Sequence, residues 1–192
     1  MNDIYKDLRE QITGLVPFPD ADWQDFVSHW HPMDVAKGAV LTKIGQVEDY
    51  FYYVHDGVVR VYALKDGEDI SIGFSYNGDY TGAYDSFLTR APSEWYIEAI
   101  APTRLLKIDY NALSYLFDQY KAAERWGRLF NAQILIGMFR RQLETRSYSA
   151  EESFERLMQQ SAHIFQLVPQ KYIASYLGMT PETLSRMRNK SR

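Results

Sequence analysis

The chain has 192 residues, 46% of them hydrophobic and 24% charged, with a net charge of −4, as in an ordinary globular protein that builds a hydrophobic core. It contains no cysteine, which excludes disulfides, cysteine-ligated zinc or iron–sulfur clusters, and thiol catalysis. Neither a secretion signal nor a stretch long enough to span a membrane is recognisable, so we expect a cytoplasmic protein without a membrane partner.

Two short helices are expected before the first strand. An apolar stripe at helical spacing is formed by Ile4, Leu8, Ile12 and Leu15. Residues 22–30, which read DWQDFVSHW, predict a second helix that Asp22 opens as an N-cap, because an aspartate oxygen accepts a free backbone N–H there.

Residues 32–108 have the sequence pattern of a β-structure. Short runs rich in Val, Ile, Tyr and Phe alternate with turn residues and glycines. The segment Lys65-Asp66-Gly67-Glu68 predicts a hairpin, because Asp-Gly accepts the positive φ of a tight turn. Many short strands at this spacing favour a barrel or roll. We therefore expect an α+β chain whose core is an antiparallel β-roll, a double-stranded β-helix of the cupin-like kind.

Residues 111–145 contain no proline and predict one long helix. Spacings of four and three residues relate Leu116, Tyr120, Ala123, Gly127, Phe130, Ile134 and Gly137. Such a seam is typical of a coiled-coil-like contact, in which small residues let two helices approach closely. We interpret it as the seam of a homodimer; the alternative is a single amphipathic helix that lies on the roll.

Residues 170–189 predict a helix, a turn and a second helix, after a capped helix that starts at Ser149. Ile173, Ala174 and Leu177 form the buried face of the first helix, and Leu184 and Met187 that of the second. The turn itself carries the strongest signals. Gly178 suits the left-handed end of a helix, Thr180 is a good N-cap and Pro181 suits the first helical position.

The exposed side of this second helix is suited to DNA. Residues 171–192 carry a net charge of +4, with one acidic residue, Glu182, against Lys171, Arg186, Arg188, Lys190 and Arg192. A guanidinium at Arg186 can read guanine, and Glu182 can accept from cytosine. Thr180 and Thr183 can hydrogen-bond phosphates, and we also place Arg188 and Lys190 in the DNA interface. The alternative is an ordinary helical hairpin with a solvated basic end.

The whole chain resembles the Crp–Fnr family of bacterial regulators, most of all its short members. The resemblance is carried by VPQKYIASYLGMTPETLSR at Val168 to Arg186, and in the roll by Lys37-Gly38, Gly45, YYVHDGVVRVY at Tyr52 to Tyr62, and Asn77-Gly78-Asp79. It implies a cyclic-nucleotide-binding-type β-roll, a long dimer helix and a winged helix-turn-helix. By the same resemblance, Glu182 and Arg186 match base-reading positions, and Thr180 and Thr183 match phosphate contacts.

Two departures from the family pattern stand in the C-terminal region. The family often has an arginine one residue before the reading glutamate, where this chain has Pro181, so one base contact is expected to be missing. The sequence stops directly after the recognition helix, so we expect no C-terminal wing.

The resemblance also implies a sensor pocket in the roll. In cyclic-nucleotide binders of this fold, a short helix after a glycine cradles the cyclic phosphate, a glutamate holds the ribose and an arginine pairs with the phosphate. Here Gly82 is present, but the glutamate position is Ala83 and the arginine position is Ser93 or Glu94; Arg90 is out of register. We therefore expect weak cyclic AMP binding, and another small effector or none. The candidate pocket walls are Gly82, Ala83, Tyr84, Ser86, Ser93, Arg141 and Thr145, although they can equally serve packing alone.

These features divide the chain into a sensor roll with N-terminal helices at residues 1–110, a dimerisation helix at 111–146 and a DNA-binding domain at 147–192. We expect a dimeric transcription regulator, not an enzyme, that binds an inverted-repeat operator in double-stranded DNA, with RNA polymerase as a further partner. The alternatives are a ligand-binding scaffold without DNA binding and a cupin-like enzyme. Cupins need clustered metal ligands, and we expect no metal site, because of the four histidines only His55 lies within the expected roll.

Overall fold

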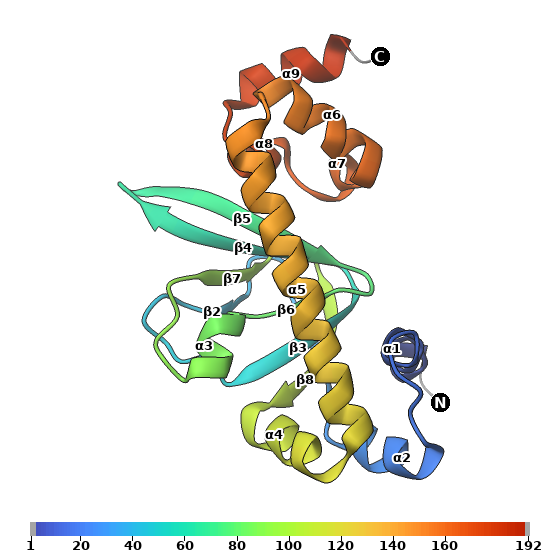
Figure 1. Ribbon diagram of the computed structural model, residues 1–192. Helices are drawn as coiled ribbons and strands as arrows, with labels where there is room; N and C mark the ends of the chain where they lie inside the picture. Colours follow the sequence, from blue (N-terminus) through green and yellow to red (C-terminus); the bar gives the residue numbers. More distant parts are fainter. Residues whose placement is uncertain (1–2, 191–192) are drawn as a thin grey trace. The chain divides into compact units, whose positions relative to one another are not determined.

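The computed structural model describes residues 3–190, which form two compact units (Figure 1). The first unit contains the residues up to 61 together with residues 74–133, and the second contains residues 62–73 and the residues from 134 onward. Arg192, which we counted in the basic end, lies outside the described residues. No helix within residues 3–190 is both long and apolar enough to cross a membrane.

The two N-terminal helices are α1 (Asp3–Thr13) and α2 (Asp20–Ser28). The expected apolar stripe is confirmed for Ile4, Leu8 and Ile12, which are buried, but the helix ends at Thr13, so Leu15 lies beyond it and is half-buried. The expected cap of α2 is wrong. This helix starts at Asp20, after Pro19, and no side chain caps it. Asp22 lies instead in its first turn, where a negative charge is stabilised by the helix dipole.

Within residues 3–190, eight strands form two four-stranded sheets. Their bounds are β1 (His31–Val35), β2 (Val40–Thr42), β3 (Tyr50–Asp56), β4 (Val58–Lys65), β5 (Glu68–Tyr76), β6 (Tyr80–Thr81), β7 (Tyr96–Ala99) and β8 (Thr103–Asp109). The strand orders are β1-β8-β3-β6 and β2-β7-β4-β5, and the recorded pairs β1–β8, β3–β8, β3–β6 and β2–β7 are all antiparallel. The antiparallel roll is thus confirmed, and so is the β4–β5 hairpin, whose Asp66 and Gly67 have φ values of 55° and 85°.

Strand β3 is buried on both faces. Phe51 and Tyr53 enter a core shared with the helices, whereas Tyr52 and Val54 enter a second core inside the roll. This split follows from the geometry of a strand, in which successive side chains point to opposite faces. The same strand therefore holds the helices on one side and closes the interior of the roll on the other.

The core between the helices and the roll is unusually aromatic. The ring of Tyr80 stacks on that of Phe51 with centroids 5.2 Å apart, and Trp126 stacks on Phe130 at 5.7 Å. Tyr80 and Trp126 join the two pairs with centroids 5.6 Å apart. Burial raises the pKa of Tyr80, so its hydroxyl stays neutral. These large flat side chains attach the start of the long helix to the first sheet.

The expected single helix over residues 111–145 is wrong at Tyr120. The structure has α4 (Tyr110–Gln119) and α5 (Lys121–Ser147), and Tyr120 between them is extended, with φ −122° and ψ 114°. The Tyr120 hydroxyl donates to an oxygen of Asp25, 2.9 Å away. The break between α4 and α5 therefore coincides with a tertiary contact to α2, and no glycine or proline at this point of the sequence predicts it.

The proposed dimer seam lies largely on the inner side of these helices. Leu116, Ala123 and Gly127 are buried, and Phe130 packs against the aromatic core. At Gly127 an added Cβ would lie 2.7 Å from the ring of Phe117, so α4 and α5 meet closely there. For this part of the chain, the alternative of a helix lying on the roll is the better description.

The exposed apolar residues of α5 lie on a different face. This stripe, which we call the α5 stripe, consists of Leu135, Ile136, Met138, Phe139 and Leu143, each 51–65% exposed. At 100° per residue, Phe139 lies about 160° around the helix from Gly137, one of the expected seam residues. An apolar face suited to another helix therefore exists, but opposite the expected seam.

The second unit gathers four further helices around the end of α5: α6 (Ala150–Ser161), α7 (Ile164–Leu167), α8 (Gln170–Leu177) and α9 (Pro181–Lys190). The expected capping box at the start of α6 is confirmed. The Glu152 carboxylate accepts from the Ser149 backbone N–H at 2.7 Å, and the Ser149 hydroxyl oxygen accepts from the Glu152 N–H at 3.2 Å. The tip of the β4–β5 hairpin belongs to the same unit, since the Ser71 N–H donates to the Ser175 hydroxyl of α8 at 2.9 Å.

We expect Phe51→Ala to lower the free energy of unfolding by about 3–5 kcal/mol, because it removes a 2%-exposed ring that both aromatic stacks depend on. Tyr115→Ala is the matched control, since that ring is 46% exposed and its loss should cost about 0.5 kcal/mol or less. Urea unfolding of both variants measures the difference. Equal losses would contradict the described core.

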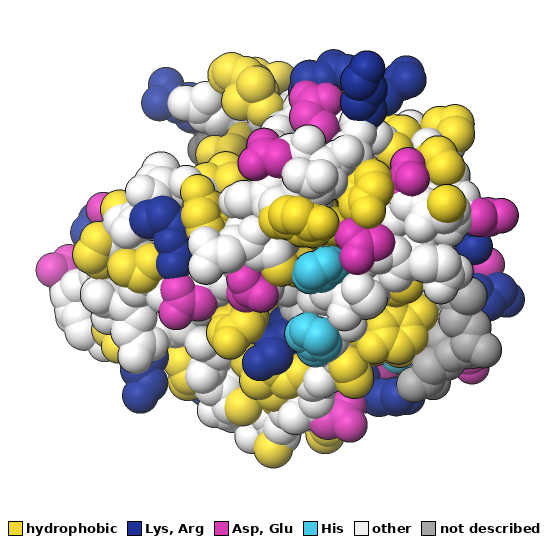
Figure 2. Space-filling view, turned by 90° about the horizontal axis from the view of Figure 1, so that it is seen from below, with side chains coloured by type: hydrophobic (Ala, Val, Ile, Leu, Met, Phe, Trp, Pro, Cys, Tyr) yellow, Lys and Arg dark blue, Asp and Glu magenta, His cyan; other side chains and the backbone are white. Residues whose placement is uncertain are grey.

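Figure 2 shows the face that carries α2 and α4, where apolar, acidic and basic side chains intermingle.

Candidate functional site

The α8–α9 pair is built around a tight turn. Ile173 and Ala174 of α8 and Leu184 of α9 have no exposed surface, so the two helices share a dry contact. Gly178 ends α8 in the left-handed region with φ 70°, where a glycine carries no penalty. Pro181 is the first residue of α9. The sequence signals for this turn are therefore confirmed at each position.

The start of α9 presents the expected base-reading side chains to solvent. Thr180 caps the helix, because its hydroxyl oxygen accepts from the Thr183 N–H at 3.2 Å. The Arg186 guanidinium lies beside this cap and donates to the Thr183 hydroxyl at 3.4 Å. Glu182 is exposed, and hydrogen bonds from its own backbone N–H and from the Thr180 hydroxyl lower the pKa of its carboxyl. Four of the six expected DNA-binding residues therefore lie together at this end of α9.

The other two lie further along the helix. Arg188 is half-buried, with its guanidinium carbon 5.7 Å from the centre of the Phe165 ring. At 100° per residue, Arg188 points about 200° away from Arg186. Lys190 is exposed at the last turn of α9. Arg188 thus contributes to packing inside the second unit, whereas Lys190 is open to solvent.

In the roll, the expected effector site begins at Gly82, just before the short helix α3 (Tyr84–Thr89). Gly82 has φ 134°, and an added Cβ would lie 3.4 Å from the Tyr50 carbonyl oxygen and 3.6 Å from a carboxylate oxygen of Glu48. The Ala83 N–H donates to that same oxygen at 3.2 Å. A carboxylate of the chain itself therefore faces the backbone of the Gly82-Ala83 turn.

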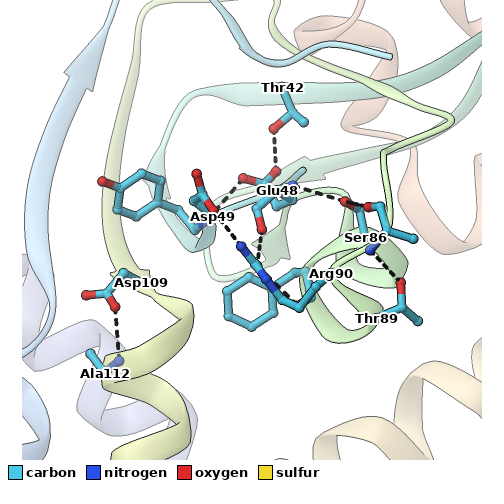
Figure 3. Close-up of polar contacts among 11 residues, drawn as sticks. Thr42, Glu48, Asp49, Ser86, Thr89, Arg90, Asp109 and Ala112 are labelled. Carbon is cyan, nitrogen blue, oxygen red and sulfur yellow. Dashed lines mark hydrogen bonds and ion pairs between the residues drawn. The ribbon is translucent and has the colours of Figure 1, made fainter. Parts of the chain in front are cut away.

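Glu48 is a functional candidate that sequence reasoning missed. It is 2% exposed, and its carboxylate also accepts from the Thr42 hydroxyl and from the Tyr50 N–H, the latter at 3.2 Å (Figure 3). Its own backbone N–H donates to the Ser86 hydroxyl oxygen at 3.0 Å. Burial raises the pKa of Glu48, while these donors favour the ionised form. Nothing in the local sequence marks a buried carboxylate here, since Glu48 sits in an ordinary polar stretch before β3.

Arg90, which the sequence placed out of register, does not face an anion site. It adopts φ 59° at the end of α3, and its guanidinium donates to the Glu48 carbonyl oxygen and to an Asp49 carboxylate oxygen, both at 2.5 Å (Figure 3). The same group lies 4.6 Å from the centre of the Tyr110 ring. The cation of Arg90 is therefore paired within the chain.

A cavity of about 400 Å³ opens beside this network, and its acidic lining residues are Glu48 and Asp49. Of the expected wall residues, Tyr84 and Ser93 hydrogen-bond elsewhere, to Asn131 and to the Trp95 carbonyl, whereas the Ser86 hydroxyl accepts from the Glu48 N–H and donates to the Ala91 carbonyl. Arg141 and Thr145 belong to the second unit. The lining that the structure gives this cavity is thus acidic and tyrosine-rich, and differs from the expected set.

The histidines are dispersed. His29 lies 3.6 Å from Asp25 and His55 lies 2.9 Å from Asp7. Within the described part of the chain, no three histidine, aspartate or glutamate side chains are grouped so as to hold a metal ion.

We expect calorimetry with cyclic AMP to show no binding tighter than about millimolar, because the Glu48 carboxylate already takes the Ala83 N–H and repels a phosphate. Glu48→Gln, which removes the charge but keeps the size, is the comparison. A dissociation constant of about a micromolar or below for the unaltered protein would overturn this account of the pocket.

Comparison with known proteins agrees with this architecture. Residues 32–120 match the family model described as cyclic nucleotide-binding domain, and no curated protein matches the chain in sequence. Among solved structures, FixK2 from Bradyrhizobium japonicum superposes with a TM-score of 0.68 at 22% identity, over 84% of this chain and 83% of that one. The c-di-GMP-responsive global regulator CLP of Xanthomonas campestris superposes with a TM-score of 0.64 at 18% identity, over 90% of this chain and 91% of that one. Catabolite activator protein from Thermus thermophilus superposes with a TM-score of 0.58 at 18% identity, over 90% of this chain and 83% of that one. Residues 32–120 therefore form a domain of the cyclic nucleotide-binding kind, in a chain that has the fold of the Crp–Fnr type regulators.

Proposed function

We propose that the chain is a dimeric, sequence-specific DNA-binding transcription regulator of the Crp–Fnr type. The observation that carries this proposal is the α8–α9 pair, in which two helices joined by a tight turn present Glu182 and Arg186 to solvent at the N-terminal end of the second helix, as expected for a helix-turn-helix. In helix-turn-helix proteins this end of the second helix enters the major groove. DNA as the partner implies a cytoplasmic protein, and RNA polymerase is the further partner that such a regulator meets at a promoter.

The geometry of α9 supports readout of two neighbouring bases. Arg186 follows Glu182 by four residues, so the two side chains are about 40° apart around the helix. The contact with Thr183 holds the Arg186 guanidinium near the helix start. A guanidinium can donate two parallel hydrogen bonds to guanine, and a carboxylate can accept from cytosine. Lys190, one turn further along, is suited to a phosphate.

The α5 stripe supports a symmetric dimer. Its five apolar residues stand on one side of an exposed helix, where solvent contact costs free energy. A second copy of the same helix would cover the stripe, since a two-fold contact pairs a surface with itself. Two copies would present two recognition helices to an inverted repeat, with half-sites about 34 Å apart.

We also propose that a small ligand bound in the roll controls DNA binding, and the residues that line the cavity restrict the charge of that ligand. Glu48 and Asp49 line the cavity, and the nearby Arg90 is paired with Asp49. A small neutral or cationic effector fits this lining better than a cyclic nucleotide, because an unpaired phosphate beside a carboxylate is costly.

We expect Arg186→Ala to weaken binding to the preferred duplex by about 1–3 kcal/mol per half-site, while leaving affinity for random duplex almost unchanged. Lys190→Ala is the matched control for a backbone contact, and should weaken both duplexes alike and flatten the salt dependence. Fluorescence anisotropy across a salt series separates the two effects. Equal losses on both duplexes for Arg186→Ala would mean that Arg186 does not read a base, and no binding of either duplex by the unaltered protein would favour a scaffold without DNA binding.

We expect Phe139→Glu to shift the protein from dimer to monomer at about micromolar concentration, because it would bury an unpaired charge in the proposed interface. Phe139 is 62% exposed in the single chain, so the variant should keep its fold. Gln133→Glu is the control, since it adds the same charge to an exposed position of the same helix about 120° around from Phe139. Sedimentation measures both variants, and an unaltered protein that is monomeric would contradict the proposed dimer.

A further inference from the structure

The second unit contains a cavity of about 490 Å³ that the proposed DNA contacts do not use. Its polar lining includes Arg140, Arg141 and Glu144 from α5, Arg156 from α6 and Tyr176 from α8. A volume of about 300–1,000 Å³ is usual for sites that hold small molecules. The cavity thus lies entirely within one unit, where three helices meet.

The lining carries an excess of positive charge. Glu144 is shared between two guanidinium groups, with 3.7 Å from its Oε2 to Nη1 of Arg141 and 3.4 Å from its Oε1 to Nη2 of Arg156. Arg140 is exposed and makes no hydrogen bond or ion pair within residues 3–190. Three arginines face one carboxylate, so the lining has a net charge of +2.

Two of the guanidinium groups are held in place by aromatic rings. The Arg141 guanidinium carbon lies 4.0 Å from the centre of the Tyr176 ring, and its Nη2 donates to the Tyr176 carbonyl oxygen at 2.7 Å. The Arg156 guanidinium carbon lies 4.6 Å from the centre of the Tyr148 ring. Such stacking reduces the side-chain freedom that a ligand would otherwise have to remove on binding.

Arg156 also has an unmet donor. Its Nε is buried and has no hydrogen-bond acceptor among the described residues, although the adjacent Nη2 contacts Glu144. A buried N–H without an acceptor costs free energy. The donors that the cavity offers to a ligand are the guanidinium groups of its three arginines.

We propose that this cavity binds a small phosphate-bearing metabolite. A phosphate monoester carries a charge of about −1.5 to −2 at neutral pH, which matches the excess charge of the lining, and its oxygens accept from guanidinium groups. A monocarboxylate would neutralise only half of that charge. The site goes beyond the proposed function, and its existence does not require DNA binding.

The cavity borders the α5 stripe, because Leu143 belongs to both. At 100° per residue, Arg141 and Glu144 lie about 200° and 140° around α5 from Phe139, on the side away from the stripe. A second copy on the stripe would therefore cover one edge of the cavity and leave these two side chains uncovered. Because the cavity draws on α8, the first helix of the helix-turn-helix, a bound metabolite would contact the element that supports α9.

The test is titration of the full chain with inorganic phosphate at constant ionic strength, followed by calorimetry. We expect saturable binding with a dissociation constant of about a millimolar or below, weakened about tenfold by Arg140→Gln and by Arg156→Gln. Arg140 makes no contact that folding needs, so its variant stays informative even if Arg156→Gln fails to fold. Arg146→Gln is the matched control, because Arg146 is exposed on the same helix and does not line the cavity.

Absence of saturable binding, or equal weakening by Arg146→Gln, would overturn the proposal. Anisotropy with duplex DNA separates the two sources of phosphate. If Arg140→Gln weakens duplex binding while free phosphate does not bind the unaltered protein, the arginines are DNA backbone contacts and the metabolite site is wrong. Saturable phosphate binding without any DNA binding would leave this site standing and contradict only the proposed function.

Discussion

Burial of β3 on both faces is the constraint on which the rest of the first unit depends. The alternation of Phe51 and Tyr53 with Tyr52 and Val54 sends one pair of side chains to the helices and the other into the roll. A slip of one residue would exchange the two cores. The aromatic core that results holds the start of α5 through Trp126 and Phe130, and α5 runs without interruption from Lys121 to Ser147.

The same register determines the chemistry of the roll. Pairing of β3 with β6 places Tyr52 opposite Thr81, directly before Gly82. Glu48, two residues before β3, therefore reaches the Ala83 N–H. A buried carboxylate is tolerated only where donors compensate its lost hydration, and Thr42, Tyr50 and Ala83 supply them. The family likeness of residues 32–120 thus coexists with a pocket whose charge disfavours an anionic ligand.

Elements specified by local chemistry were predictable from the sequence. The Asp66-Gly67 turn, the Ser149 capping box and the Gly178–Pro181 turn each depend on residues a few positions apart, so spacing alone identifies them. The break at Tyr120, the role of Glu48 and the exposed face of α5 depend on partners distant in the sequence. Helical spacing gave the period of the apolar residues in α5, but could not say which of two apolar faces the roll would cover.

We assign base recognition to the start of α9, dimerisation to the α5 stripe and ligand sensing to cavities lined by charged side chains. DNA recognition is the central proposal, because the dimer and both ligand sites acquire a regulatory meaning only through it. Selection of bound sequences from random duplex DNA with the purified protein tests this claim most directly. The account predicts enrichment of an inverted repeat whose half-sites are about one helical turn apart, each with a guanine. Recovery of unenriched sequences, or of a single half-site without its repeat, would contradict it.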